Sequence, residues 1–226
     1  MRKMTLLLSL AATALLGLSL NAQTTLLQYG FDGDSLDPTT EAANITGGTF
    51  DHANSATTAT FFFYTGSTLG ASQPAANVAG NNQENWASND TDPNLTRYYT
   101  FTLTVDSGSV NLDEVSFAWN HSTNGPKSWQ LRSDLDGDNF TTVLGTNTVS
   151  SADTNTVETI VLSSAFDDFS GTVEFRIYGY GAVQNTSGQG FRIDDVTVSA
   201  IPEPGTFAML AGLSSLMWVM VLRRKK

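Results

Sequence analysis

Apolar and polar residues alternate with a period of two along most of this chain, which is the pattern of strands with one buried face. The clearest stretch is 97–106, where aromatic and aliphatic residues alternate with threonines. Shorter stretches of the same character are 26–31, 61–64, 115–119, 129–131, 142–144, 157–162, 173–177 and 191–198. Turns rich in Gly, Asn and Asp separate them. This rhythm predicts an all-β domain, a single antiparallel β-sandwich of jelly-roll type.

Two places break the alternation. Residues 65–96 are rich in Gly, Asn, Ser and Ala, and Trp86 is their one aromatic residue. A segment of this length and composition predicts a surface loop, either flexible or used for binding, with room for a short strand. In residues 191–198 the apolar residues stand at odd positions before Asp194 and at even positions after Asp195. That change predicts a β-bulge at these two residues.

The start of the chain has a different character. Arg2 and Lys3 precede an uncharged apolar run over 4–20, and small or polar residues follow up to Ala22 and Gln23. This order is typical of a secretory signal peptide, and it predicts export through the Sec translocon with cleavage between Ala22 and Gln23. A retained membrane helix is the alternative. Residues 1–22 are therefore set apart from the folded domain.

The end of the chain is a second segment of membrane character. Residues 206–222 carry no charge, and 17 helical residues extend about 25 Å, close to the thickness of a bilayer core. Two prolines just before this segment disfavour helix, so we expect an extended strip there. Four basic residues follow the segment and favour a cytoplasmic end. They are Arg223, Arg224, Lys225 and Lys226.

The motif Pro202-Glu203-Pro204, the apolar segment and the basic end occur in the order of the PEP-CTERM sorting signal of Gram-negative bacteria, which this tail resembles. The resemblance implies that exosortase, a membrane-embedded peptidase, removes the tail after transient anchoring. The protein would then reach the cell surface or the medium. An ordinary single-pass anchor is the alternative. The expected organisation is a signal peptide at 1–22, a β-sandwich ectodomain at 23–199 and a sorting signal at 200–226.

The charge and composition of the ectodomain exclude some classes of partner and of stabilising bond. Between residues 23 and 201 the chain has 21 acidic and five basic side chains, a formal charge of −16. This surface repels phosphate backbones, so we expect no nucleic-acid partner. The chain has no cysteine, so the core must hold the fold without disulfides.

A cluster of carboxylates offers one candidate metal site. Asp134, Asp136 and Asp138 alternate around Gly137 and could supply oxygen ligands to Ca²⁺. The EF-hand spacing is not met, because no Glu stands at the twelfth position from Asp134. A solvated hairpin turn is the alternative, and Asp32-Gly33-Asp34 presents the same choice. No other cofactor is expected.

Residues suited to catalysis are few. The chain has two histidines, His52 and His121, and lacks the motifs of nucleophilic triads and of zinc hydrolases. His121 follows an alternating stretch and is interpreted as a strand-end residue. Glu114, Glu158 and Glu174 are the candidates for a glycosidase pair, but Glu158 and Glu174 alternate with apolar neighbours as solvent-facing residues do. We therefore expect no enzyme activity.

Four aromatic residues could form a platform on which sugar rings stack. These residues are Trp119, Trp129, Tyr178 and Tyr180. The two tryptophans alternate in step with apolar neighbours, so we predict that they lie in the core. Tyr180 lies between two glycines, after the last apolar alternation, and we predict that it is exposed. The sequence assigns no ligand-binding residue. It predicts an exported, non-enzymatic surface or extracellular-matrix protein, with exopolysaccharide as a candidate partner. The alternative is a carbohydrate-binding module supported by calcium.

Overall fold

A computed structural model describes residues 23–32, 35–54, 61–64, 75–78, 86, 91–135, 139–183 and 190–200. No helix in this part of the chain is long and apolar enough to cross a bilayer. Several predicted features lie outside the described residues, and they remain predictions. These are residues 1–22 with Ala22, the aspartates Asp34, Asp136 and Asp138, the motif Pro202-Glu203-Pro204, the segment 206–222 and the basic end 223–226.

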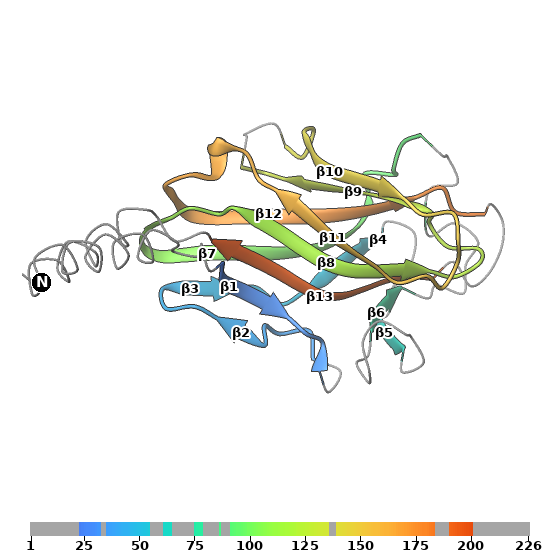
Figure 1. The fold of residues 1–226 in the computed structure, drawn as a ribbon, viewed down its shortest axis with the longest axis horizontal. Coiled ribbons are helices and arrows are strands. Elements are labelled where there is room, and N and C mark those ends of the chain that lie inside the picture. Colours follow the sequence, from blue (N-terminus) through green and yellow to red (C-terminus); the bar gives the residue numbers. More distant parts are fainter. Residues whose placement is uncertain are drawn as a thin grey trace, which may run out of the picture. The chain divides into compact units, whose positions relative to one another are not determined.

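The described residues build two antiparallel sheets that face each other, as the alternating pattern predicts (Figure 1). The seven-stranded sheet has the order β11-β8-β13-β1-β2, with β6 on β13 and β5 on β6. Its strands are β1 (Thr24–Tyr29), β2 (Thr40–Glu41), β5 (Phe61–Tyr64), β6 (Ala75–Val78), β8 (Glu114–His121), β11 (Thr156–Val161) and β13 (Phe191–Ala200).

The six-stranded sheet has the order β10-β9-β12-β7-β3, and β4 also pairs with β7. Its strands are β3 (Ile45–Gly47), β4 (Asp51–Asn54), β7 (Arg97–Val110), β9 (Ser128–Ser133), β10 (Val143–Thr148) and β12 (Phe169–Tyr180). A 3-10 turn at Ser164–Phe166 precedes β12. From β10 to β13 the chain changes sheet at every step, which is the crossing pattern of a jelly-roll sandwich.

The core lies between the two sheets and is rich in aromatic rings. Trp119 and Trp129 are at most 1% exposed, which confirms their predicted core position. Phe117 of one sheet meets Trp129 of the other edge to face, with ring centroids 4.9 Å apart. Trp86 is also buried, with its ring centroid 5.2 Å from that of Phe191. The segment interpreted as a surface loop therefore contributes a core residue, and it contains the short strand β6.

The predicted β-bulge is confirmed. The register between β13 and β8 shifts between Asp194 and Thr197, and Asp195 has a φ of 49°. Because the bulge adds a residue to one strand, Ile193 and Val196 both reach the core, and both are fully buried. Of the two aspartates at the bulge, Asp194 is buried and Asp195 is exposed.

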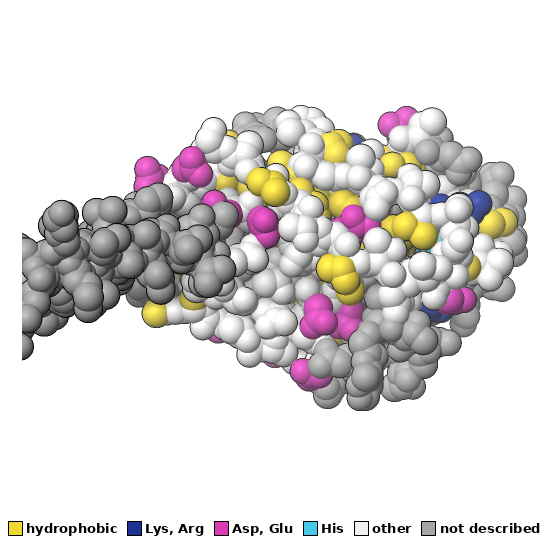
Figure 2. Space-filling view, in the orientation of Figure 1, with side chains coloured by type: hydrophobic (Ala, Val, Ile, Leu, Met, Phe, Trp, Pro, Cys, Tyr) yellow, Lys and Arg dark blue, Asp and Glu magenta, His cyan; other side chains and the backbone are white. Residues whose placement is uncertain are grey.

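In strand β11, at the edge of the seven-stranded sheet, the side chains that face the core are not the ones that were predicted to do so. Val157 and Val161 are 73% and 72% exposed, whereas Ile160 is buried. Glu158 shares the inward parity of Ile160 and accepts a hydrogen bond of 2.9 Å from Trp119 Nε1. The prediction that Glu158 faces solvent was therefore wrong. Apolar side chains are scattered over the face of the molecule that carries β11, β8 and β13 (Figure 2).

Candidate functional site

The outer face of the six-stranded sheet carries large side chains where a solvated sheet face needs only small polar ones. Val173, Phe175 and Ile177 of β12 point into the core, so the alternating residues Glu174, Arg176 and Tyr178 point outward. The register aligns this outward row with the neighbouring strands. Its cross-strand pairs are Arg176 with Thr100 and Arg132, Glu174 with Thr102, and Tyr178 with Gln130.

An arginine lies at the centre of this face between two aromatic rings. The guanidinium carbon of Arg176 lies 4.1 Å from the ring centroid of Tyr98 and 3.5 Å from that of Phe140. Tyr98 also lies against Tyr178, with centroids 5.4 Å apart. Cation–π contacts of this kind hold a planar guanidinium in one orientation. We call Tyr98, Phe140 and Arg176 the arginine sandwich.

Hydrogen bonds fix the polar groups around the arginine sandwich. Glu174 Oε1 accepts a bond of 2.7 Å from Arg176 Nε and one of 2.8 Å from Thr100 Oγ1. On the other side, Arg132 donates to Gln130 Oε1 at 2.6 Å and to the carbonyl of Phe140 at 2.8 Å. Arg132 thus ties the backbone at Phe140 to the sheet. The side chains of Arg176 and Glu174 remain 21% and 27% exposed, so the face is ordered and still open to solvent.

The two tyrosines at the end of β12 are buried, which corrects one prediction. Tyr180 is 6% exposed, so the prediction that it is exposed was wrong, and its hydroxyl lies 3.3 Å from Thr146 Oγ1 of β10. Tyr178 is 1% exposed. Burial raises the pKa of Tyr178, and the hydrogen bond and charge of Arg176 act against this rise. Tyr178 therefore packs against Tyr98 of the arginine sandwich as a buried, neutral side chain.

Of the predicted calcium site, the structure describes only Asp134. One carboxylate oxygen of Asp134 accepts a hydrogen bond of 2.8 Å from the backbone N–H of Glu174. Asp136 and Asp138 lie outside the described residues, so the site stays a prediction. Within the part of the chain that the structure describes, no three histidine or acidic side chains are gathered as in a metal centre.

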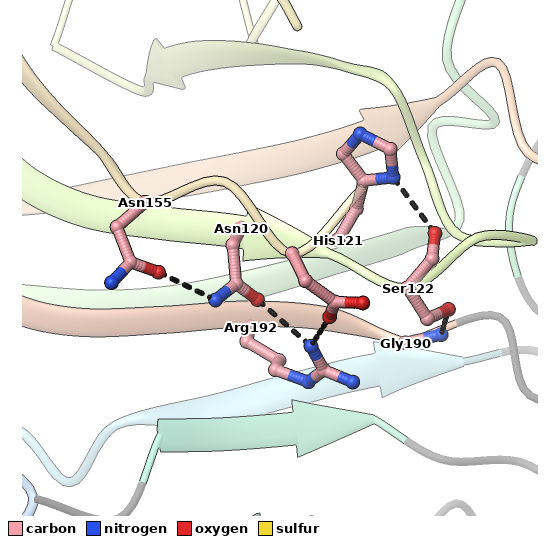
Figure 3. A network of polar contacts seen from close by, with 7 residues as sticks. Asn120, His121, Ser122, Asn155, Gly190 and Arg192 are labelled. Carbon is pink, nitrogen blue, oxygen red and sulfur yellow. Dashed lines mark hydrogen bonds and ion pairs between the residues drawn. The ribbon is translucent and has the colours of Figure 1, made fainter. Parts of the chain in front are cut away.

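A second polar network lies at the end of β8 (Figure 3). Arg192 donates to Asp153 at 2.6 Å and to Asn120 at 3.1 Å, and Asn120 donates to Asn155 at 2.8 Å. His121 ends β8, as predicted, and is buried. Its Nδ1 lies 2.8 Å from the carbonyl oxygen of Ser122, and its Nε2 lies 3.0 Å from that of Val149. Both ring nitrogens are thus occupied by backbone, which favours a structural role for this network.

The three candidate glutamates are not brought together. Glu158 points inward at the edge of the seven-stranded sheet and also accepts a bond of 2.7 Å from Asn147 Nδ2. Glu114 pairs in register with Val161, whose side chain is exposed, and so lies on the outer face of that sheet. Glu174 lies on the outer face of the other sheet. These placements do not form the carboxylate pair of a glycosidase.

Sequence reasoning missed Tyr98, Phe140 and Arg176. Their separation along the chain hides their contact, but one signal was available. Arg132 and Arg176 are two of only five cations between residues 23 and 201; Arg176 stands at an outward position of the predicted strand 173–177, and Arg132 directly follows the predicted strand 129–131. Two of the five cations of an acidic domain on one sheet face indicate that this face differs in charge from the other surfaces.

No protein-family model matches the sequence, and no curated protein sequence matches it. Solved structures similar to this chain include the K2 adhesin domain of Lys-gingipain from Porphyromonas gingivalis, at 11% identity and a TM-score of 0.40, covering 78% of this chain and 97% of that one. A family 61 carbohydrate-binding module in complex with β-1,4-galactotriose has 11% identity, a TM-score of 0.39 and coverage of 75% and 92%. A family 29 carbohydrate-binding module has 11% identity, a TM-score of 0.36 and coverage of 78% and 88%. At these identities the similarity concerns the β-sandwich fold alone.

Proposed function

We propose that the ectodomain is a non-catalytic carbohydrate-binding module whose binding face is the outer face of the six-stranded sheet. The observation that supports this proposal is the arginine sandwich, in which Arg176, 21% exposed, lies between the half-buried Tyr98 and the buried Phe140. Such a group is not needed to stabilise a solvated sheet face. It provides the combination of ring surface and oriented polar groups with which proteins hold sugars.

The chemistry of this face suits a sugar chain. The C–H face of a pyranose packs against aromatic surface, which the half-buried Tyr98 supplies, whereas Phe140 is 6% exposed and serves to hold Arg176. Sugar hydroxyls need both donors and acceptors. Arg176 donates and the carboxylate of Glu174 accepts, and Thr102 and Thr104 extend the hydroxyl-bearing surface along β7. Because these groups are already held by hydrogen bonds, binding requires little side-chain ordering.

The proposal predicts a loss of binding when the arginine sandwich is disrupted. Glycan-array screening of the protein, with and without chelator, identifies a ligand, and titration calorimetry then measures its affinity. We expect Tyr98→Ala and Arg176→Lys each to weaken binding about tenfold or more, because ring surface and the planar guanidinium are lost. Lys127→Ala, which removes a positive charge from outside the arginine sandwich, should leave the affinity unchanged. Equal losses in all three variants, or a ligand whose affinity none of them alters, would refute the proposal.

We also propose that this module belongs to an exported surface or extracellular-matrix protein that exosortase processes through its PEP-CTERM signal. The supporting observations are the motif Pro202-Glu203-Pro204, the uncharged segment 206–222 and the four basic residues that follow it. In this account the exopolysaccharide of the cell envelope or matrix is the natural class of ligand. The acidic ectodomain, with five cations against 21 acidic side chains, suits an extracellular module without a nucleic-acid partner.

Intact-mass measurement on protein recovered from its native host tests the processing. A species that begins near Gln23, ends near Pro204 and is found at the cell surface or in the medium is the expected result. A full-length C-terminus in the membrane fraction would leave an ordinary anchored ectodomain. Replacement of Glu203 by Ala is expected to retain the uncleaved tail, whereas replacement of Gln28 by Ala, within the ectodomain, is not.

A further inference from the structure

Two arginines lie directly opposite each other on the outer face of the six-stranded sheet. Arg132 of β9 and Arg176 of β12 are cross-strand partners in the register of these strands. Both also contact Phe140, because Arg132 donates a hydrogen bond of 2.8 Å to its carbonyl and the guanidinium carbon of Arg176 lies 3.5 Å from its ring centroid. We call Arg132 and Arg176 the arginine pair. Like charges opposite each other destabilise a sheet, so an anion is needed to offset them.

One of the two arginines has a carboxylate partner among the described residues, and the other has none there. Arg176 forms an ion pair of 2.7 Å with Glu174. The hydrogen bonds of Arg132 go to neutral acceptors, which are the side-chain oxygen of Gln130 and two backbone carbonyls. Asp134 follows β9, but its carboxylate accepts from the backbone N–H of Glu174 and forms no ion pair with Arg132. The charge of Arg132 is thus not offset within the part of the chain that the structure describes.

The rings around Arg176 decide how a ligand can reach it. Tyr98 and Phe140 lie against its guanidinium, and rings stacked on this group leave its N–H donors, which lie in its plane, for hydrogen bonds. Nε donates to Glu174, and Tyr178 also hydrogen-bonds to the group. A guanidinium has more N–H donors than these two partners accept. Because the side chain is 21% exposed, the remaining donors can serve a ligand.

We propose that the sugar chain bound by this face is acidic, and that a uronate carboxylate of the ligand lies between Arg132 and Arg176. This proposal rests on the carbohydrate-binding role proposed above and names the class of its ligand. A planar carboxylate matches the N–H donors of a guanidinium, and it can bridge two of them here because adjacent strands are only about 5 Å apart. The ring of the same sugar packs against the half-buried Tyr98 beside Arg176.

The negative charge of the ectodomain is compatible with an acidic ligand. Acidic side chains outnumber basic ones by 16 between residues 23 and 201. At physiological ionic strength, exposed charges more than about 8 Å from the ligand are largely screened, so the arginine pair in contact with the carboxylate dominates. The remaining acidic surface repels polyanions in general. Recognition therefore depends on the arginine pair and on the sugar ring, and not on the net charge of the domain.

Titration calorimetry of the full-length protein with matched oligosaccharides tests the proposal. Oligomers of galacturonic, glucuronic and mannuronic acid are each compared with their methyl esters, which have the same rings and no charge. We expect the free acid of the preferred oligomer to bind at least about tenfold more tightly than its ester, because only the free acid forms charge-assisted hydrogen bonds with the arginine pair.

Variants assign this preference to the arginine pair. Arg132→Gln should reduce the affinity ratio of acid to ester to about one to two, and Arg132→Lys, which keeps the charge, should retain more of it. Lys127→Gln, which removes a cation outside the arginine pair, should leave the ratio unchanged. Circular dichroism confirms that each variant is folded.

The outcomes separate this proposal from the carbohydrate-binding role itself. Equal affinity for acid and ester, or a ratio that Arg132→Gln leaves unchanged, would overturn the acidic ligand, while the binding of a neutral sugar would still support the carbohydrate-binding role. A preference for sulfated sugars over uronates would also overturn the uronate. Absence of binding to acidic and neutral sugars alike would refute both proposals.

Discussion

At about pH 8, replacement of Asp194 by Asn is expected to raise the free energy of unfolding by up to about 4 kcal/mol. Burial, then the charges of Asp195 and Asp32, raise the pKa of Asp194 from 3.8 to about 7. Above this pKa the folded protein holds a buried charge that the unfolded chain exposes to water. Asn removes the charge and keeps the Oδ1 acceptor for the Asp195 N–H, although its buried NH2 group reduces the gain.

The pH dependence separates this effect from a packing effect. Below about pH 3, well under the unfolded pKa of 3.8, Asp194 is protonated in both states, so Asp and Asn should give equal stability. As the pH rises from about 4 to 7, the unfolded state ionises first and the wild-type protein loses stability, so the advantage of Asn grows across this window. Urea denaturation of both proteins at about pH 4, 6 and 8 measures it. Asp167→Asn, on the exposed surface, is the control. An advantage of Asn that is the same at every pH would contradict this account.

Replacement of Phe175 by Ala is expected to lower the free energy of unfolding by about 3–5 kcal/mol. Phe175 is fully buried on β12, and its ring lies between Phe101, at a centroid distance of 5.2 Å, and Phe166, at 6.0 Å. The rings on both sides belong to regular elements that cannot close over the cavity without moving a strand. Urea denaturation measures the loss.

Val161→Ala is the matched control for Phe175→Ala. Val161 also lies in a strand, but its side chain is 72% exposed, so its truncation should change the stability by no more than about 0.5 kcal/mol. A small effect at Phe175 together with a large one at Val161 would mean that the facing of β12 and β11 is not as described.

The alternating pattern predicted the fold where one parity alone is apolar. In β7, Tyr99, Phe101 and Leu103 are buried, and the threonines between them are not. Strand β11 shows the limit of this reasoning. Both of its parities contain apolar residues, so the pattern does not decide which set faces the core. The choice is made by packing, because Ile160 is buried and Glu158 receives the indole N–H of Trp119.

The candidate site depends on contacts that no local pattern records. Phe140 and Tyr98 lie far apart along the chain, and both reach Arg176 only because β7 and β12 are neighbours and the backbone at Phe140 is tied down by Arg132. The glycines beside Tyr180 indicated exposure, but the side chain is buried and its hydroxyl contacts Thr146 of β10. In the same way the sequence predicted the bulge at Asp194, while the burial of its carboxylate depends on the tertiary fold.

The outer face of the six-stranded sheet is the proposed carbohydrate-binding face. Titration of the oligosaccharide identified on the glycan array into ¹⁵N-labelled protein, followed by NMR, tests it most directly. We expect amide shifts concentrated on β7 and β12 around Tyr98 and Arg176, with saturation at the calorimetric affinity. Shifts confined to the seven-stranded sheet, or to the network around Arg192, would contradict it.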